Sequence, residues 1–486
     1  MDYNEYTIQQ SAQGTKAYFS SHPMKEWQFY DYFFSSRQKS KLKNFNRIVS
    51  EYTADINWIL TQESVPEQIQ GSVVTCCHEK KKEEEEQKEK KEQKEKKEQK
   101  EKKEQEEQEE QKEQKEVDET DGFWKRWIEF LKNKESFHPY SPENHNIIRC
   151  GKGISHRPNL DSDIYRDHLE SHKNNIFNIP VSYIPYIDGI LSSENNSQYK
   201  KAIRGVPDCD DNEECDYDFL ESIFRGTYKF HTTCQDIKSD ESTFNSLFIY
   251  PFLEAVADYL KDSNDRCKAS FCCGERSLQA MKNQLEDLPI YQDDCHIYLA
   301  DGIIKLMGLK NIELLLLETS GPFQNKDKSK IAFDHHKGLF GALAMLKAIE
   351  DSFPQASIET FGSLKVFFIH AASESLYLWS LRFEQKAQIY DLWLEDMLLI
   401  KPKIDDKLEA LSSFLRFFWA LKCFLEESIL KISQLKKEHN HSLFVNRFKS
   451  DPFPSSLSTI VDPSILKLTE EDDKTGMHLL GPFFNQ

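Results

Sequence analysis

One short stretch constrains the fold more than any other part of this chain. Residues 300–323 read ADGIIKLMGLKNIELLLLETSGPF, which predicts two strands, Ile303–Met307 and Ile312–Thr319, joined by a tight turn. The second strand carries a continuous apolar run, a pattern typical of the interior of a sheet rather than of a half-exposed edge. We therefore expect the centre of a buried sheet at this point.

Two acidic residues bracket the expected hairpin. Asp301 stands at the mouth of the first strand and Glu318 at the end of the second. Carboxylates held close together on rigid strands are ligands for a hard cation such as Mg²⁺. The alternative is that both side chains are simply solvated at strand ends. A separation of more than about 8 Å between the two carboxylates would exclude a shared metal ion.

Amphipathic segments flank the hairpin. Phe244–Lys261 has an apolar stripe at helical spacing and carries Glu254 on its polar side; Lys330–Asp351 predicts a second helix, and Leu364–Ala371 a third buried strand. This order resembles the PD-(D/E)XK nuclease-like superfamily, and the amino-acid sequence of the segment looks like that of a fungal branch of it. The resemblance covers about 140 residues, 244–383, and implies an α/β fold with a small mixed sheet flanked by helices.

The same resemblance implies a site. Asp301 and Glu318 would bind Mg²⁺ or Mn²⁺, with Glu254 as a further ligand, and the substrate would be a nucleic-acid phosphodiester. Where the superfamily has Glu-x-Lys, this chain has Glu318-Thr319-Ser320. We expect Lys337, in the next helix, to supply the missing cation.

Other readings of these residues stay open. Lys326 or Lys328 would be other sources of the cation, and Lys337 would otherwise be an exposed lysine near a helix start. Without the usual lysine, the chain would be a weak nuclease or a catalytically inactive nuclease-fold protein that binds a protein partner or regulates one. An α/β protein unrelated to nucleases is a third alternative.

The charge balance limits the kind of partner. The formal net charge is −19, which disfavours a wide nucleic-acid-binding surface and leaves room only for a local site. Eleven cysteines, an odd number, favour reduced thiols. The chain shows no signal-peptide pattern and no apolar run of about 20 residues. We therefore expect an intracellular protein, cytoplasmic or nuclear, with no membrane partner.

A low-complexity tract interrupts the chain. Residues 79–116 contain only Glu, Lys and Gln, with the hexad KEKKEQ repeated at 88–93, 94–99 and 100–105. The tract has high helix propensity and lacks the apolar seam of a coiled coil. It predicts a solvated single helix or a partly frayed helical spacer.

The chain divides into six regions by composition and periodicity. The expected regions are an N-terminal helical region (1–75) with a helix near Lys41–Gln62, the spacer (76–120), a variable region that could belong to the core domain (121–243), the nuclease-like core (244–400), a long amphipathic helix (401–450) and a tail (451–486). Within the core, residues 376–381 predict a strand antiparallel to the one at Leu364–Ala371.

Three further clusters resemble binding sites only in part. Asp208–Asp218 is dense in acidic residues but lacks the glycine and the final glutamate of a calcium loop, so a solvated loop is expected. Cys267, Cys272, Cys273, Cys295 and His296 lack the paired C-x2-C spacing of a zinc site, so the cysteines are expected to be buried and free. His335 and His336 point about 100° apart on a helix, so at most one would border the site.

Overall fold

The computed structural model consists of two compact units, residues 1–116 and residues 117–486. It describes residues 7, 17–23, 45–61, 67, 122–132, 137–172, 177–209, 211–263, 267–286, 298–402, 407–447, 456–468 and 476–483. The Glu/Lys/Gln tract at 79–116 lies outside the described residues. Among the described helices, none combines the length and the apolar character that a membrane span needs.

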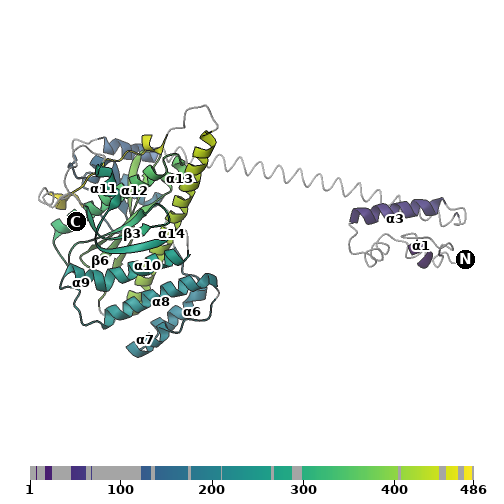
Figure 1. The fold of residues 1–486 in the computed structure, drawn as a ribbon, viewed down its shortest axis with the longest axis horizontal. Helices are drawn as coiled ribbons and strands as arrows, with labels where there is room; N and C mark the ends of the chain where they lie inside the picture. The colour runs from purple at the N-terminus through teal and green to yellow at the C-terminus, as the bar shows by residue number, and fades with distance from the viewer. Residues whose placement is uncertain are drawn as a thin grey trace. The chain divides into compact units, whose positions relative to one another are not determined.

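In the first unit the described helices are α1 (Ala17–Ser21) and α3 (Phe45–Leu60) (Figure 1). α3 confirms the helix expected near residues 41–62. Ile48, Ile56 and Ile59 are buried. Their spacing places them on one face, as the apolar periodicity predicted.

The second unit is built on one seven-stranded mixed sheet with the order β1-β7-β6-β5-β4-β3-β2. The strands are β1 (Ile147–Gly151), β2 (Ala269–Ser277), β3 (Leu299–Leu306), β4 (Ile312–Thr319), β5 (Val366–Ala372), β6 (Ser375–Glu384) and β7 (Ile389–Leu399). The pairs β4–β5 and β1–β7 are parallel, and the other neighbours are antiparallel. A mixed sheet is therefore confirmed, but it is larger than the small sheet expected.

Helices cover both faces of the sheet (Figure 1). The longer ones are α5 (Ser162–Ser171), α6 (Ile184–Leu191), α7 (Asn196–Ile203), α8 (Asp211–Thr232), α10 (Tyr250–Ser263), α11 (Gln279–Glu286), α12 (Lys328–Ser352) and α14 (Lys407–Asn446), and residues 122–131 are also helical. The short ones are η5 (Pro142–His145), η6 (Val181–Tyr183), α9 (Glu241–Phe244), η7 (Asn245–Ile249, one turn of π-helix), α13 (Ile358–Gly362), η10 (Leu457–Thr459) and η12 (Met477–Leu479).

Adjacent strand residues show which helix lies on which face. Glu318 contacts α12 through Lys337, whereas Thr319, the next residue of β4, bonds to Asn245 in the helical segment before α10. Because successive side chains of a strand point to opposite faces, α12 and α10 lie on opposite sides of the sheet. Phe367 of β5 packs against Phe424 of α14, so α14 shares the α10 side.

Much of the core follows the hydrophobic pattern. Every residue of β4 is buried, as expected for a central strand. β6 pairs antiparallel with β5, which confirms the expected neighbour strand. α14 confirms the long C-terminal helix, and its apolar stripe packs on the unit's own core, with Leu421, Leu425 and Ile432 fully buried.

Three details differ from the sequence-based expectations. β3 begins at Leu299, so Asp301 lies inside the strand and not at its mouth. The acidic segment expected as a loop instead opens α8 from Asp211, where negative side chains are favourable in the first turn of a helix. Within it, Asp216 accepts hydrogen bonds from Lys422 and Tyr183. β1 brings part of region 121–243 into the sheet.

Candidate functional site

Three elements meet at the candidate site: β3, β4 and the first turns of α12. β3 and β4 pair antiparallel with Gly302 opposite Leu317. One step further along the same register places Asp301 opposite Glu318, and directly opposed residues of an antiparallel pair share a face. That face is the one covered by α12.

Both carboxylate oxygens of Glu318 have partners. The Nζ of Lys337 donates to Glu318 Oε2 over 2.7 Å, and the hydroxyl of Tyr298 lies 2.7 Å from Oε1. The Lys337 ammonium also donates to the carbonyl oxygen of Leu299 at 2.7 Å. Glu318 is buried, while the Lys337 side chain keeps 21% of its surface exposed, so the pair opens to solvent on the lysine side.

Asp301 is fixed by the end of β4. Its Oδ2 accepts a hydrogen bond from the backbone N–H of Thr319 at 2.6 Å. The backbone carbonyl of Asp301 accepts from the hydroxyl of Tyr250, on α10. The aspartate is therefore held by the neighbouring strand β4 and by α10, beside the backbone that carries Glu318.

A third acid and a second lysine extend the cluster along α12. The Nζ of Lys330 lies 3.4 Å from Oδ2 of Asp334 and 3.6 Å from Oε2 of Glu241. Glu241 also accepts a hydrogen bond from the backbone N–H of Gly321. Lys330, Asp334 and Lys337 are three and four residues apart and therefore project from one face of the helix.

Burial dominates the protonation behaviour of the three acids. It raises the pKa of Asp301 to about 7, that of Glu318 to about 8 and that of Asp334 to about 6. Repulsion between carboxylates adds to burial, from Glu241 on Asp301 and from Asp301 on Glu318. Lys337 opposes the increases at Asp301 and Glu318. Burial lowers the pKa of Lys337, but the attraction of Glu318, Asp301 and Asp334 together outweighs it and raises that pKa. Strongly perturbed acids in one cluster are a mark of functional sites.

Ser320 occupies the position at which the superfamily motif has its lysine. It is buried, and its hydroxyl lies 2.9 Å from Nε2 of His370, on β5. Burial lowers the pKa of His370 to about 3, so the imidazole is neutral near pH 7. His335 and His336 are also fully buried, and the rings of His335 and His370 lie 5.7 Å apart.

A glycine allows α12 to approach the site closely. A Cβ on Gly338 would lie 2.7 Å from a ring carbon of Phe368 and 3.5 Å from Cγ of Glu318. A helix can bring Lys337 to Glu318 at this distance only because position 338 has no side chain.

The structure brings some of the expected site residues together and leaves others out. Asp301, Glu318 and Lys337 form one cluster. Glu254 lies on the exposed side of α10. The acid that raises the pKa of Asp301 by repulsion is Glu241, the first residue of α9. Lys326 and Lys328 are exposed and line a hollow beside Tyr377 and His478. Cys267, Cys272 and Cys273 form no disulfide; Cys267 is buried as expected, whereas Cys272 and Cys273 are only half-buried, and Cys295 and His296 lie outside the described residues.

The apolar pattern of the two predicted strands did not indicate that Tyr298, Glu241 or Asp334 belongs to the cluster. Asp334 and Lys330 share the helical face of Lys337, and this spacing was visible in the sequence. Tyr298 lies three residues before Asp301, and nothing about a lone tyrosine at a strand start marks it as a partner of Glu318.

Comparisons with protein-family models, with curated proteins and with solved structures found no match to this chain. The function is therefore inferred from the geometry of the cluster and from the order of the elements.

Proposed function

We propose that this chain is a Mg²⁺- or Mn²⁺-dependent, nuclease-like phosphodiesterase of low activity, with Asp301, Glu318 and Lys337 at its centre. The observation that carries the proposal is the 2.7 Å contact between Lys337 Nζ and Glu318 Oε2. It supports a lysine that has moved from the strand position of Ser320 to the helix that covers the strand.

The order of elements supports the same proposal. In chain order the elements are α10, β2, α11, β3, β4, α12, α13 and β5. β2, β3 and β4 are antiparallel neighbours, and β5 returns parallel to β4 after α12 and the short α13. The acids lie on the two middle strands of this unit. This is the arrangement that the resemblance to the PD-(D/E)XK superfamily implies.

The residues present fit a hard divalent cation. The donor set consists of carboxylate oxygens, and the acids raise one another's pKa, a repulsion that a cation would relieve. Three ligand atoms do not converge within 4.8 Å here among the described residues. Mg²⁺ does not require such a cage, because it usually keeps several waters and is held by one or two carboxylates.

Each residue of the cluster has a role in this proposal. Asp301 and Glu318 would hold the cation; an ionised carboxylate oxygen can accept a hydrogen bond and still offer a lone pair to a metal. When bound, the cation would polarise the scissile phosphate and lower the pKa of an attacking water. Lys337 would stabilise the negative charge that develops on the phosphate. Glu254, being exposed on α10, has no role at this site.

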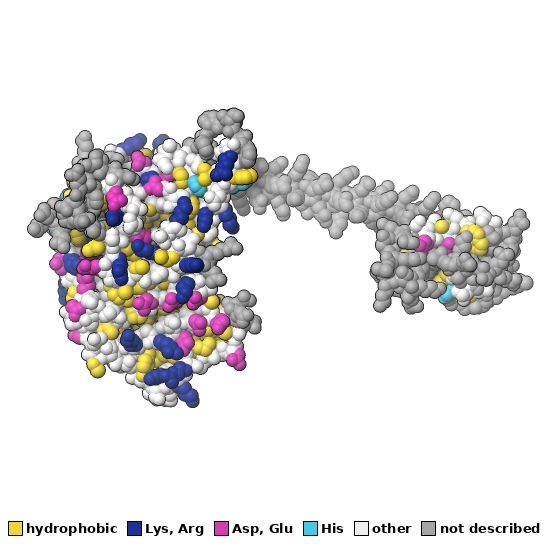
Figure 2. All heavy atoms as spheres, viewed as in Figure 1, with side chains coloured by type: hydrophobic (Ala, Val, Ile, Leu, Met, Phe, Trp, Pro, Cys, Tyr) yellow, Lys and Arg dark blue, Asp and Glu magenta, His cyan; other side chains and the backbone are white. Residues whose placement is uncertain are grey.

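The surface charge favours a local nucleic-acid contact. On the face shown in Figure 2, basic and acidic side chains of the described residues are mixed over the sheet-containing unit instead of forming one broad basic surface. Lys330 and Lys337 are the cations that face the acidic cluster directly. A short stretch of backbone phosphate at the site is therefore the substrate we propose.

Cleavage assays on single- and double-stranded DNA and RNA with Mn²⁺ test the proposal. We expect slow cleavage that is lost in Asp301→Ala and falls at least about tenfold in Lys337→Ala, since one electrostatic or acid–base partner is typically worth about 10²–10⁴-fold. Lys261→Ala, an exposed lysine on α10, is the matched control and should keep wild-type activity. Ser320→Lys, which restores the superfamily order, should raise the rate. Cleavage that survives Asp301→Ala would contradict the proposed site.

A catalytically inactive, partner-binding protein is the second candidate. The observation that favours it is that both oxygens of buried Glu318 already have partners in Lys337 and Tyr298. Folded wild type and Ser320→Lys that both fail to cleave any of the four substrates would favour this candidate over the enzyme.

A further inference from the structure

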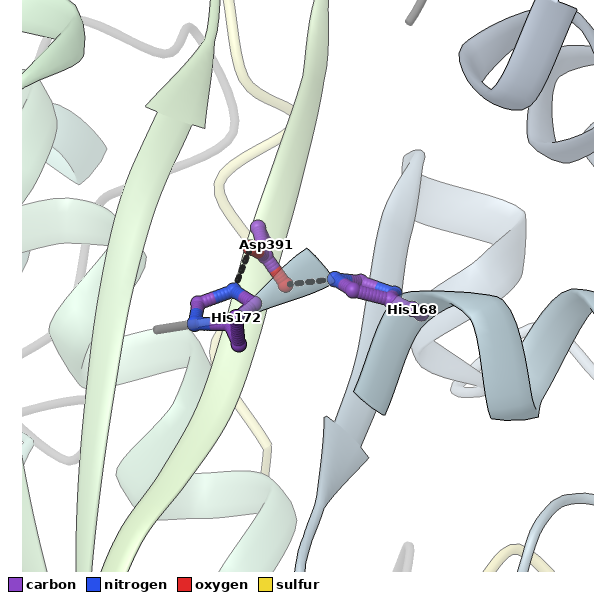
Figure 3. A group of neighbouring side chains, drawn as sticks. All are labelled: His168, His172 and Asp391. Atoms are coloured by element: carbon purple, nitrogen blue, oxygen red, sulfur yellow. Dashed lines mark hydrogen bonds and ion pairs between the residues drawn. The ribbon is translucent and has the colours of Figure 1, made fainter. Parts of the chain in front are cut away.

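A second cluster lies at the β7 end of the sheet, away from β4. His168 stands in the last turn of α5, His172 directly follows that helix, and Asp391 lies in β7 (Figure 3). β5 and β6 separate β7 from β4, so this cluster is distinct from the Glu318 site. The four-residue spacing places both imidazoles on one side of α5, facing the strand.

The ligand atoms of the three side chains converge. His168 Nε2 lies 3.4 Å from Asp391 Oδ1, and His172 Nε2 lies 3.1 Å from Asp391 Oδ2. One ligand atom from each of the three side chains lies within 4.8 Å of the others. Ligands about 2.0–2.2 Å from a tetrahedral zinc ion are about 3.3–3.6 Å from one another. Each imidazole lies at about this distance from one oxygen of Asp391, and the three ligand atoms are near enough together for small side-chain movements to bring them around one ion.

Two members of the cluster are buried without complete hydrogen bonding. His168 and Asp391 are fully buried, yet neither ring nitrogen of His168 has a hydrogen-bond partner, and Asp391 Oδ1 has none. Leaving a buried polar atom unsatisfied costs about 1–3 kcal/mol. His168 Nε2 and Asp391 Oδ1 face each other at 3.4 Å without forming a hydrogen bond, and an ion bound by both atoms would satisfy both.

Aromatic rings enclose the imidazoles. Trp124 and Trp127 meet the ring of His168 edge to face, and Trp393 stacks on His172 with 3.6 Å between ring centroids. His172 keeps 12% of its surface exposed and marks the side from which an ion could enter. Such surroundings restrict the motion of both rings.

The charge of the cluster is already partly balanced. Arg382 donates to Asp391 Oδ2 through Nε at 3.2 Å and through Nη2 at 3.0 Å. This contact orients the carboxylate and leaves Oδ1 toward His168. It also provides the competing explanation, in which His168, His172, Arg382 and Asp391 form a buried ion-pair network with no metal.

We propose that His168 Nε2, His172 Nε2 and the carboxylate of Asp391 bind one Zn²⁺ ion. Imidazole nitrogens favour zinc and its transition-metal neighbours over Mg²⁺, and three protein ligands leave one position for water or another small ligand. The ion would tie α5 to β7 and so fasten region 121–243 to the sheet.

Zinc binding by the full chain tests this proposal. Protein treated with a chelator is titrated with Zn²⁺, and with Co²⁺ as a spectroscopic probe of tetrahedral coordination. We expect one equivalent to bind, the affinity to fall at least about tenfold in His168→Gln and in His172→Gln, and His156→Gln, which removes an exposed histidine, to bind as wild type does. Asp301→Asn combined with Glu318→Gln should leave zinc binding unchanged and so separate the two sites.

Thermal melting keeps the test decisive if a histidine variant fails to fold. Zn²⁺ should raise the midpoint of chelator-treated wild type, because a ligand that binds the folded state stabilises it by mass action. Wild type whose midpoint does not respond to Zn²⁺, or His168→Gln that binds as tightly as wild type, would overturn the proposal and leave the ion-pair network as the explanation.

Discussion

At the scale of single residues, the proposed site depends on two neighbouring acids, a half-buried Asp301 and a fully buried Glu318. Asp301 and Glu318 are held by Thr319, Tyr298 and Lys337, and burial keeps their pKa values near 7 and 8. The sequence indicated both acids because each stands next to a strongly apolar strand. Glu254, which the resemblance implied as a further ligand, lies on the exposed side of α10, and apolar periodicity gives no information on which polar residue of a helix reaches a distant strand.

The raised pKa values predict how stability depends on pH. In the unfolded chain these carboxyls lose their protons near pH 4, whereas in the folded chain Asp301 and Glu318 keep them to about 7 and 8. The folded state therefore binds more protons, and its stabilising contribution is present at low pH and lost as pH rises through 7–8.

Between about pH 5.5 and 8.5, we expect the free energy of unfolding of metal-free wild type to fall by at least about 1 kcal/mol more than that of the double variant Asp301→Asn/Glu318→Gln. The size follows because a tenfold difference in a proton-binding constant corresponds to about 1.4 kcal/mol. Urea unfolding at several pH values, with a chelator present, measures the difference. Parallel pH dependences for the two proteins would show that these acids titrate normally.

At the scale of elements, the local patterns predicted the β3–β4 hairpin, α12, β5, β6 and α14. They did not predict β7 or its pairing with β1. β7 includes Asp391, Glu395 and Asp396, which break the apolar run by which a buried strand is recognised. Asp391 is tolerated in the core because Arg382 and His172 contact it. β1 joins the sheet from more than 200 residues away, and such a long-range pairing leaves no local signal.

Close contact between α12 and the sheet predicts a large effect at Gly338. Gly338→Ala would place a Cβ 2.7 Å from Phe368, and overpacking of this kind typically costs about 1–3 kcal/mol. The same change at Gly189, which lies exposed in α6 with nothing within 4 Å, should stabilise the helix by about 0.5–1 kcal/mol. Chemical denaturation of both variants checks the opposite signs. Equal effects would mean that α12 does not approach the sheet this closely.

At the scale of the whole molecule, the chain consists of two units, and the sheet-containing unit holds the carboxylate cluster and the His168–His172–Asp391 cluster. The boundary between the units, after Glu116, falls at the end of the Glu/Lys/Gln tract, the feature of the sequence that has no apolar residues. The sequence could not show that region 121–243 supplies β1 and α5, because that region is rich in polar residues and its apolar clusters are scattered.

The Glu/Lys/Gln tract should be dispensable for the stability of the sheet-containing unit. Having no apolar side chain, residues 79–116 offer nothing to bury against a folded core. Deleting them should leave the thermal midpoint of the main transition within about 1–2 °C of wild type. A loss of several degrees, or of soluble expression, would show that the tract contacts a folded part of the chain.

Magnesium binding at the carboxylate cluster is the central claim, and titration calorimetry tests it most directly. Mg²⁺ is the right ion for this measurement because oxygen ligands favour it and the imidazoles of the second cluster do not. We predict a saturable heat for wild type that is absent in Asp301→Asn/Glu318→Gln and present in His168→Gln. Identical heats in wild type and the carboxylate double variant would contradict this claim.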